Sequence, residues 1–250
     1  PVHQFTNYQS MNDTFHTQAI ILHRRPFKEN DLSVSVYSRD VGALELVARG
    51  ALKPKSKLAG HIEPLIRADL MIVRGKGGNY VGSSVGRDFY VNIKEDPVKM
   101  NYAGSALRLI KKETKEGETG ESAFIFDLLK QHLDILDSKK KEYELLNFSF
   151  FLKFLELLGV EPQLFYCCEC GVAIKAGNNF FNSREGGVVC SGCGKKKTRS
   201  GFSVSDDCLK VLRFLKNDTL VRAGDLKVQD KKLRQETASV IKSFYEYNFL

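Results

Sequence analysis

Residues 17–48 read TQAIILHRRPFKENDLSVSVYSRDVGALELVA, and this stretch decides how the chain begins to fold. It contains three short runs rich in β-branched and aromatic residues, with Pro26 and Gly42 among the turn formers between them. Runs of this length and composition are typical of β-strands, and proline and glycine mark the turns that separate strands. We therefore predict three strands, at residues 17–22, 32–38 and 43–48.

The following residues continue this pattern as far as residue 93. Three further strands are predicted at residues 68–73, 80–85 and 89–93, with the glycine-rich segment GKGG at residues 75–78 between them. That segment lacks the spacing of a phosphate-binding loop and is typical of a hairpin turn. Roughly five or six short strands within about eighty residues favour a small closed barrel or a sandwich, and an OB-fold matches this size.

From Pro97 onward the apolar residues change to helical spacing. Helices are predicted at residues 100–112, 122–136 and 143–158. The third is apolar on nearly all sides, so we expect it at the buried centre of a helical domain. Two more helices are expected near the C-terminus. One would begin after Ser205, a candidate N-cap followed by two aspartates, and the other would span residues 230–247.

Two matched cysteine pairs are the clearest chemical signal in the chain. They occur in CCECG at residues 167–171 and in CSGCG at residues 190–194, each of the form Cys-x-x-Cys-Gly. A two-residue spacer lets both sulfurs reach one metal ion, and the glycine permits the tight turn that this requires. Because no further ligand is evident, the spacing predicts a closed, structural zinc site with four ligands: Cys167, Cys170, Cys190 and Cys193.

Other interpretations of the cysteines fit the sequence less well. A redox-active pair normally stands alone near a βαβ unit, and the predicted elements contain no such unit. Zinc deaminases combine His-x-Glu with Pro-Cys-x-x-Cys. His61 begins a His-x-Glu string, but Tyr166 takes the place of the proline. Cys168 and Cys208 are predicted not to bind metal.

The net charge of +8 is concentrated in two parts of the chain. Residues 17–94 carry 13 Lys and Arg against 7 Asp and Glu, residues 195–250 carry the same numbers, and residues 95–194 carry 12 against 15. The basic loop RGALKPKSK at residues 49–57 alternates cations with small or rigid residues, which suits contact with phosphates of any sequence. We predict DNA contacts from this loop and from other cations of the first domain: Arg24, Arg25, Lys28, Arg39, Arg49, Lys53, Lys55 and Lys57.

Four aromatic residues of the first domain are candidates for stacking on bases, if they point outward: Tyr37, Tyr80, Phe89 and Tyr90. For each of them, packing in the core is the more common role. The sequence contains no GxSxG string, no HxxxH pair and no suggestive cluster of carboxylates, so we expect no enzymatic activity.

No stretch has the length and apolarity of a membrane span, and the N-terminal residues lack the pattern of a signal peptide. We therefore expect a cytoplasmic protein, in which clustered cysteines bind metal more often than they form disulfides. Residues 1–16 are expected to form a flexible segment. Met11 is a candidate natural start, which would make residues 1–10 an expression remnant.

Several short strings occur in a fixed order along the chain: TQAIIL at 17–22, KEND at 28–31, ARGA at 48–51, the two cysteine pairs, GG at 186–187 and IKS at 241–243. Each string is weak by itself, but the ordered set covers nearly the whole chain. Together they resemble the RecO family of bacterial recombination mediators.

The resemblance implies an α+β multidomain protein. An N-terminal OB-fold β-barrel at residues 17–94 would be followed by an α-helical domain at residues 95–166, with an embedded four-cysteine zinc module at residues 167–200. Residues 201–250 would supply C-terminal helices that complete the helical domain.

The resemblance also implies a function that is not enzymatic. RecO proteins bind single- and double-stranded DNA, anneal complementary strands and contact the C-terminal tail of single-strand-binding protein. With RecR they help to load RecA onto DNA coated with that protein, during recombinational DNA repair. Such a protein would act in the bacterial cytoplasm, at the nucleoid.

Two other classes of function stay open at the level of sequence. A zinc-containing protein-interaction adaptor would have no direct DNA activity, and its basic barrel would be incidental. A zinc hydrolase or deaminase would hold an exchangeable water in place of a fourth sulfur. Salt-dependent DNA binding distinguishes the mediator from the adaptor, and the number of sulfur ligands tests the zinc enzyme.

Overall fold

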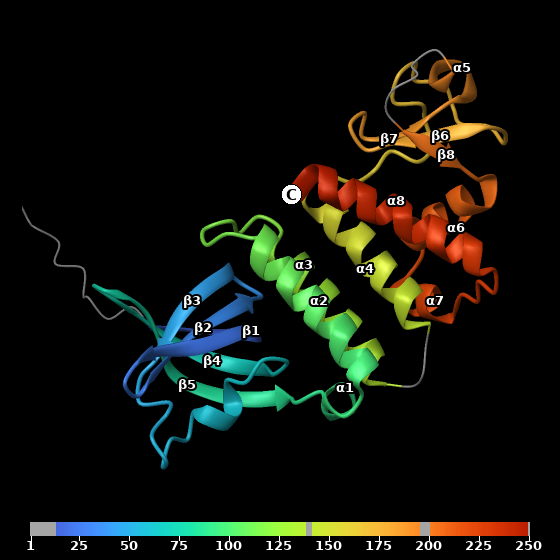
Figure 1. The fold of residues 1–250 in the computed structure, drawn as a ribbon. Helices are drawn as coiled ribbons and strands as arrows, with labels where there is room; N and C mark the ends of the chain where they lie inside the picture. The colour runs from blue at the N-terminus through green and yellow to red at the C-terminus, as the bar shows by residue number, and fades with distance from the viewer. Residues whose placement is uncertain (1–13, 139–141, 196–200, 250) are drawn as a thin grey trace, which may run out of the picture. The chain divides into compact units, whose positions relative to one another are not determined.

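The computed structural model describes residues 14–138, 142–195 and 201–249 (Figure 1). The chain divides into two compact units. The first contains the residues up to Val91 together with Leu107–Asp127, and the second contains Asn92–Ala106 together with the residues from Leu128 onward. The expected remnant at residues 1–10 lies outside the described residues.

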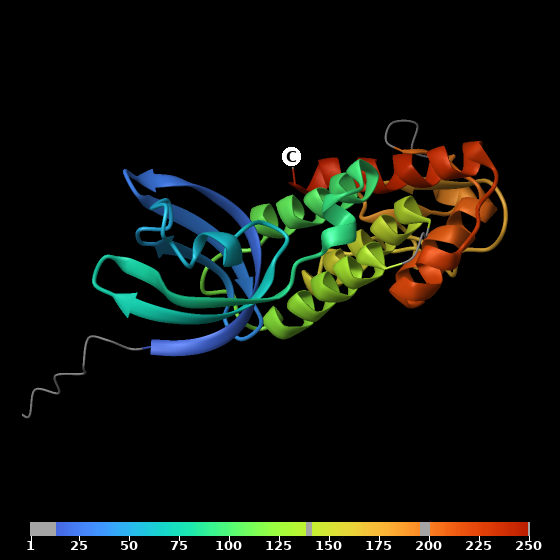
Figure 2. The same ribbon diagram turned by 90° about the horizontal axis from the view of Figure 1, so that it is seen from below.

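Five strands of the first unit form a closed barrel in the order β1-β2-β3-β5-β4. All neighbouring pairs are antiparallel except β3 and β5, which run parallel where Leu46 pairs with Asn79. Figure 2 shows how strongly the strands bend as they close the barrel. This arrangement confirms the predicted OB-fold barrel. The strands are β1 (Thr14–Lys28), β2 (Asp31–Ser38), β3 (Gly42–Ala48), β4 (Arg67–Gly75) and β5 (Gly78–Asp88).

The first strand closes the barrel because it pairs with two neighbours. Its residues 14–20 pair with β4, and its residues 19–28 pair with β2. The register with β2 shifts between Ile21 and His23, so one extra residue bends the strand as it passes from one partner to the other. A single strand thereby joins both edges of the sheet.

An apolar core fills the barrel from alternate positions of its strands. In β4, Ala68, Leu70 and Ile72 are fully buried, and the residues between them are only partly buried, as the two-residue period of a strand requires. The other strands and the β3–β4 connection add further buried residues to this core, among them Ile21, Val34, Val36, Leu46, Ile62 and Ile66.

Two expectations for the first unit need correction. Strand β1 begins at Thr14, so residues 14–16 belong to the barrel and not to a flexible segment. The strand predicted at residues 89–93 is wrong, because Tyr90 has a φ of +47° and the short helix α1 (Val91–Lys94) follows it. The GKGG segment does form the predicted hairpin turn, since Gly75 pairs with Gly78 across it.

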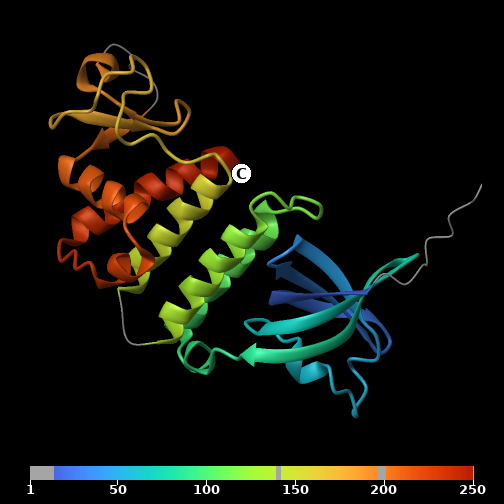
Figure 3. The same ribbon diagram turned by 180° about the vertical axis from the view of Figure 1, so that it is seen from behind.

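The second unit is built around helices. No helix among the described residues is long and apolar enough to cross a membrane. As expected, Ser205 accepts a hydrogen bond from the backbone N–H of Cys208 and caps α6. Figure 3 shows α2, α3 and α4 running alongside one another. The end of α2 and the start of α3 belong to the first unit. The helices of more than four residues are α2 (Pro97–Glu113), α3 (Ser122–Asp137), α4 (Tyr143–Leu157), α6 (Asp206–Asn217), α7 (Leu220–Asp225) and α8 (Lys231–Phe249).

Helix α4 lies at the centre of this unit, as its all-round apolarity predicts. Phe150 and Phe154 are both buried, and their rings stack in parallel with centroids 6.3 Å apart. The buried hydroxyl of Ser149 donates a 2.6 Å hydrogen bond to the carbonyl of Leu215 in α6. A second bond runs from Nζ of Lys153 to the carbonyl of Lys216 at 2.8 Å, so the helix joins α6 through apolar packing and satisfied polar contacts.

A small three-stranded sheet carries the cysteine segment. Its strands β6 (Asn179–Asn182), β7 (Gly187–Val189) and β8 (Phe202–Val204) follow the order β7-β6-β8, and the short helix α5 (Ser191–Gly194) follows β7. Strand β8 lies beyond residue 200, the expected end of this module. Phe181 in β6 is fully buried and contacts the ring of Phe244 in α8, which ties the sheet to the helices.

A buried histidine stands out in the helical unit. His132 in α3 is fully buried against the ring of Phe150, with ring centroids 4.5 Å apart. Neither ring nitrogen has a hydrogen-bond partner among the described residues. Burial lowers the pKa of His132 to about 3, so the folded protein holds a neutral imidazole with an unsatisfied N–H group.

We expect His132→Leu to raise the free energy of unfolding by about 1 kcal/mol near neutral pH, because it removes an unsatisfied buried donor. The effect should grow in acid. As the pH falls below the ordinary value of 6.5, the unfolded histidine binds a proton and the folded one does not. The wild type therefore loses up to about 1.4 kcal/mol of stability per pH unit in this window, down to a pH of about 3.

Urea unfolding of both proteins at several pH values between about 7.5 and 5 measures this difference. The variant should show a shallower loss of stability as the pH falls. Equal slopes for the two proteins would show that His132 is not the group responsible.

Candidate metal centre and nucleic-acid interface

The structure brings the four predicted cysteines of the helical unit together. The sulfurs of Cys167, Cys170, Cys190 and Cys193 all lie within 4.8 Å of one another. Four sulfurs arranged tetrahedrally at about 2.3 Å from one metal would lie about 3.8 Å apart. The Sγ atoms of Cys170 and Cys190 are separated by 3.8 Å. This cluster could hold a metal ion.

Two tight backbone turns position these sulfurs. In the first, Cys167 donates its N–H to the carbonyl of Val172, and Gly171, with a φ of +71°, donates to the carbonyl of Cys167. In the second, the backbone N–H groups of Cys193 and Gly194 donate to the carbonyl of Cys190, which precedes α5. The glycine of the first pair thus has the left-handed conformation that its sequence motif predicts.

The electrostatics of the cluster favour a bound cation. Burial raises the pKa of Cys167, but N–H groups of Cys190, Cys170 and Glu169 donate toward its sulfur and lower the pKa to about 6. Hydrogen bonding with the sulfurs of Cys170 and Cys190 raises the pKa of Cys193 to about 12. Four thiolates so close together repel one another, and a metal ion between them removes that repulsion.

The remaining cysteines are not part of the cluster. Cys168 is half-buried, donates its backbone N–H to Val188 and contributes no sulfur to the group of four. Cys208 is fully buried in α6, with its sulfur 3.7 Å from the hydroxyl of Thr237. The histidine of the deaminase-like string is also occupied, since Nδ1 of His61 accepts the backbone N–H of Gly86 at 3.1 Å.

A second candidate site lies at one end of the barrel. Lys28 ends β1 and Asp31 begins β2, and the carboxylate of Asp31 accepts the backbone N–H of Gly50 at 2.8 Å. The carbonyl of Asn30 accepts the N–H of Leu52 at 3.0 Å, so the β1–β2 turn holds the start of the basic loop. Six exposed cations, which we call the basic rim, come from these two segments: Arg25, Lys28, Arg49, Lys53, Lys55 and Lys57.

The cations of the basic rim are available to a ligand. None of the six forms an ion pair with an acidic residue in the part of the chain that the structure describes. Arg49 lies over the ring of Tyr80, 4.0 Å from its centroid, which orients the guanidinium without neutralising it. A partner with regularly spaced negative charges is the natural complement to such a rim.

Two of the predicted DNA-contact residues lie in other surroundings. Arg24 donates to the carboxylate of Glu63 and to the carbonyl of Ala59, both at 3.2 Å, so its charge is already paired. Arg39 forms two hydrogen bonds with Asp127, at 3.2 and 3.1 Å, and these raise its pKa.

Arg39 is also remote from the basic rim. It follows Ser38, which pairs with Gly42, whereas the rim lies at the other end of β2 and β3. A strand rises about 3.3 Å per residue, so the eight residues of β2 separate the two ends by roughly 20 Å. Of the eight residues predicted to contact DNA, six therefore form the basic rim, and the two others, Arg24 and Arg39, are paired with carboxylates.

The aromatic candidates for base stacking also divide. Tyr37 and Tyr90 are buried in the first unit, as core packing requires. Phe89 is 39% exposed but its ring packs near His61, and Tyr80 is partly covered by Arg49. None of the four presents a bare ring beside the basic rim.

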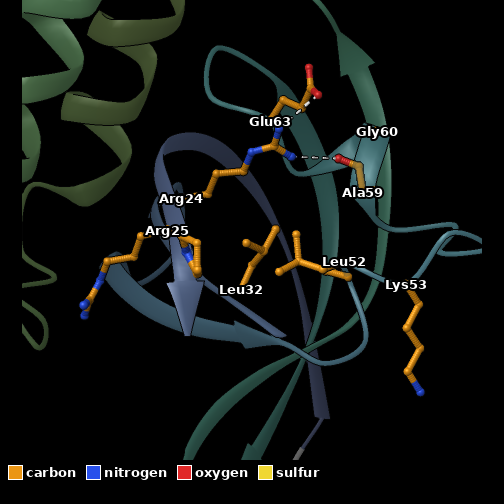
Figure 4. A pocket seen from close by; sticks show the side chains of 10 residues that line it. Arg24, Arg25, Leu32, Leu52, Lys53, Ala59, Gly60 and Glu63 are labelled. Atoms are coloured by element: carbon orange, nitrogen blue, oxygen red, sulfur yellow. Dashed lines mark hydrogen bonds and ion pairs between the residues drawn. The ribbon is translucent and has the colours of Figure 1, made fainter. Parts of the chain in front are cut away.

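A groove beside the basic rim was not predicted from the sequence. It has a volume of about 440 Å³ and lies between the end of β1 and the basic loop, with Glu63 at one end (Figure 4). Pro26, Leu32 and Leu52 are among its lining residues and make part of its surface apolar. The sequence marks Glu63 only as the last residue of the His-x-Glu string, and it does not show the pairing with Arg24, which is 39 residues away in the chain.

Comparison with known proteins gives two adjoining matches. A family model described as "Recombination protein O N terminal" matches residues 11–84, and one described as "Recombination protein O C terminal" matches residues 94–249. The chain belongs to the RecO family.

The curated relatives agree with this assignment over most of the chain. A protein from Pelotomaculum thermopropionicum is 31% identical over 234 residues, 94% of this chain and 89% of its own. A protein from Alkaliphilus metalliredigens is 29% identical over 178 residues, 71% of each chain. A protein from Caldanaerobacter subterraneus is 30% identical over 199 residues, 80% of this chain and 77% of its own. Each is named "DNA repair protein RecO". Membership of the RecO family is consistent with a role in recombinational DNA repair.

The metal centre can be tested with two matched variants. We expect Cys190→Ala to lose bound metal and to expose residues 167–204 to limited proteolysis, because three sulfurs no longer complete the tetrahedron. Cys168→Ala removes a neighbouring thiol outside the cluster and should leave the metal content unchanged. Elemental analysis by mass spectrometry reads out both, and equal metal loss in the two variants would contradict the assignment.

Proposed function

We propose that this chain is a DNA-binding recombination mediator that anneals complementary single strands. With RecR, it would help to load RecA onto DNA coated with single-strand-binding protein, whose C-terminal tail it would contact. The single observation that carries the proposal is the basic rim at one end of an OB-fold barrel in a RecO-family chain, a set of cations that form no ion pair with any described residue. OB-folds commonly bind single-stranded nucleic acids by combining a basic surface with contacts to bases.

Annealing has a simple electrostatic requirement that the basic rim can meet. Two DNA strands repel each other through their phosphates, and lysine and arginine side chains reduce this repulsion when they displace the condensed counterions. The rim cations lie largely on a connecting loop and have no base-reading geometry of their own. Binding through the rim cations would therefore depend strongly on salt and little on sequence.

In the proposed activity, the chain holds DNA strands and protein partners in position and makes or breaks no covalent bond. The four cysteine sulfurs would occupy every coordination position of the metal, so no open site is left for a water or a substrate. The chain would instead act through single- and double-stranded DNA and its protein partners, at the bacterial nucleoid.

We propose that the metal is zinc in a structural role. Thiolate sulfur is a soft ligand, and tetrahedral four-sulfur sites without redox function characteristically hold zinc. The bound ion would join the turn at residues 167–171 to the start of α5 and so hold the small sheet together. X-ray absorption at the zinc edge should give four sulfur neighbours at about 2.3 Å. An oxygen neighbour would instead support a zinc enzyme.

The mediator function is tested by removing charge from the basic rim. We expect the triple variant Arg49→Gln, Lys53→Gln and Lys55→Gln to bind single-stranded DNA at least about tenfold more weakly near 0.1 M salt. The slope of log K against log salt should fall by about 2, because roughly 0.7 counterions are released for each phosphate contact on a single strand. Strand annealing should slow in parallel.

A matched control carries the same loss of charge elsewhere: Lys227→Gln, Lys231→Gln and Lys232→Gln, all exposed residues of the helical unit. It should bind and anneal nearly as well as the wild type. Annealing of DNA coated with single-strand-binding protein, with and without RecR, then tests the mediator step. A wild-type chain with no DNA affinity that still bound the tail of single-strand-binding protein would favour the adaptor.

A further inference from the structure

The groove beside the basic rim has an apolar floor in a strongly polar region. Leu32 is buried, whereas Leu52 is 47% exposed although it belongs to the basic loop. Figure 4 shows the two leucine side chains next to each other, with Arg25 and Lys53 extending outward on opposite sides. The floor thus offers a flat apolar contact with a positive charge on each side of it.

Backbone contacts fix the walls of this groove. The N–H of Leu52 donates to the carbonyl of Asn30, which anchors the basic loop. On the other side, His61 lies between the lining residues Gly60 and Glu63 and is held to β5. Its carbonyl accepts a hydrogen bond from the hydroxyl of Ser84 at 2.9 Å, and Nδ1 of its ring accepts one from the backbone N–H of Gly86. One side is therefore held by the β1–β2 turn and the other by β5, and a ligand would find the groove already formed.

One carboxylate gives the groove a directional polar group. Oε1 of Glu63 accepts a hydrogen bond from Arg24, and the second oxygen has no partner among the described residues. The side chain of Glu63 is 46% exposed. Arg24 offsets the negative charge and holds the carboxylate in place (Figure 4). The free oxygen can accept a hydrogen bond from a ligand donor.

We propose that this groove binds one unpaired nucleotide of single-stranded DNA. The base lies on the apolar floor formed by Leu32 and Leu52, its phosphates contact Arg25 and Lys53, and Glu63 accepts a hydrogen bond from an amino group of the base. The volume of about 440 Å³ is within the usual range of small-ligand sites, roughly 300–1,000 Å³. This proposal rests on the proposed DNA-binding function and adds a way to distinguish single from double strands.

The chemistry of the groove selects for bases that are not paired. In a duplex the base faces are stacked, so they are not available to the leucines, although one amino hydrogen of cytosine stays open in the major groove. A carboxylate accepts well from the amino group of cytosine, whereas thymine offers no amino group. The groove therefore favours cytosine over thymine, and it releases the base when a complementary strand pairs with it.

Binding of short oligonucleotides tests the apolar floor. Fluorescence anisotropy would compare oligo(dC), oligo(dT) and a duplex of equal length at a pH above 7. We expect Leu52→Ala to weaken single-strand binding about fivefold, because the base loses apolar contact area. Duplex affinity should stay within about twofold of the wild type, because the duplex contacts only the cations. Val85→Ala is the matched control, since Val85 is a similarly exposed barrel residue (49%) outside the groove.

The role of the carboxylate is tested by its base preference. We expect the wild type to bind oligo(dC) at least about threefold more tightly than oligo(dT), and Glu63→Gln to bring this ratio close to one. Asp127→Asn is the matched control, because it removes another arginine-paired carboxylate of the first unit and should keep the preference.

The outcomes separate this proposal from the proposed function. If the wild type binds no DNA, the proposed function fails. If the wild type binds DNA but Leu52→Ala and Glu63→Gln behave like their controls, only the nucleotide site is overturned. Equal weakening of single- and double-strand binding by Leu52→Ala would also overturn it. If Leu52→Ala and Glu63→Gln weakened only the binding of a peptide with the C-terminal sequence of single-strand-binding protein, the groove would be a site for a protein partner. That result would overturn the nucleotide site as well.

Discussion

The double pairing of β1 is the constraint on which the barrel and its candidate site depend. One half of this strand hydrogen-bonds to β4 and the other half to β2, with a bulge between Ile21 and His23 where it bends. Closure shortens the open sheet edge, because β3 and β5 pair where Leu46 meets Asn79, and it fixes which connections share one end of the barrel. The β1–β2 turn and the loop after β3 meet at that end because Leu32 pairs with Ala48. The basic rim and the groove both follow from that placement.

The distribution of ion pairs determines which cations of the barrel can meet a ligand. The first domain has a large excess of Lys and Arg, but Arg24, Arg39 and Arg67 each pair with a carboxylate. An exposed ion pair contributes little stability, yet it holds the side chains in place. The paired cations are therefore less available to phosphates. One of them, Arg24, instead positions the carboxylate of Glu63. Among the described residues, the six cations of the basic rim form no ion pair, and they lie together at one end of the barrel.

The cysteine cluster has a separate physical basis. Its sulfurs come from two tight turns whose geometry is local, and backbone hydrogen bonds between residues 163–168 and β7, such as that from the N–H of Cys168 to the carbonyl of Val188, bring the turns together. Gly187 shows how closely this segment is packed, because a Cβ at this position would lie 2.1 Å from the carbonyl oxygen of Gln163. The cysteine cluster and the basic rim therefore belong to different units of the chain.

The sequence by itself determined the features that depend on neighbouring residues: the strand and helix periods, the hairpin at GKGG, the N-cap at Ser205 and the spacing of the four cysteines. The prediction of a strand at residues 89–93 was wrong, because the backbone of Tyr90 has a left-handed conformation that ends the extended chain. Only the tertiary structure decided which cations are free, because the partners of Arg24 and Arg39 lie 39 and 88 residues away in the chain. The groove, too, exists only after closure brings Leu32, Leu52 and Glu63 together. Local spacing encodes backbone conformation and ligand sets, whereas the availability of a charge depends on which distant side chain the fold places beside it.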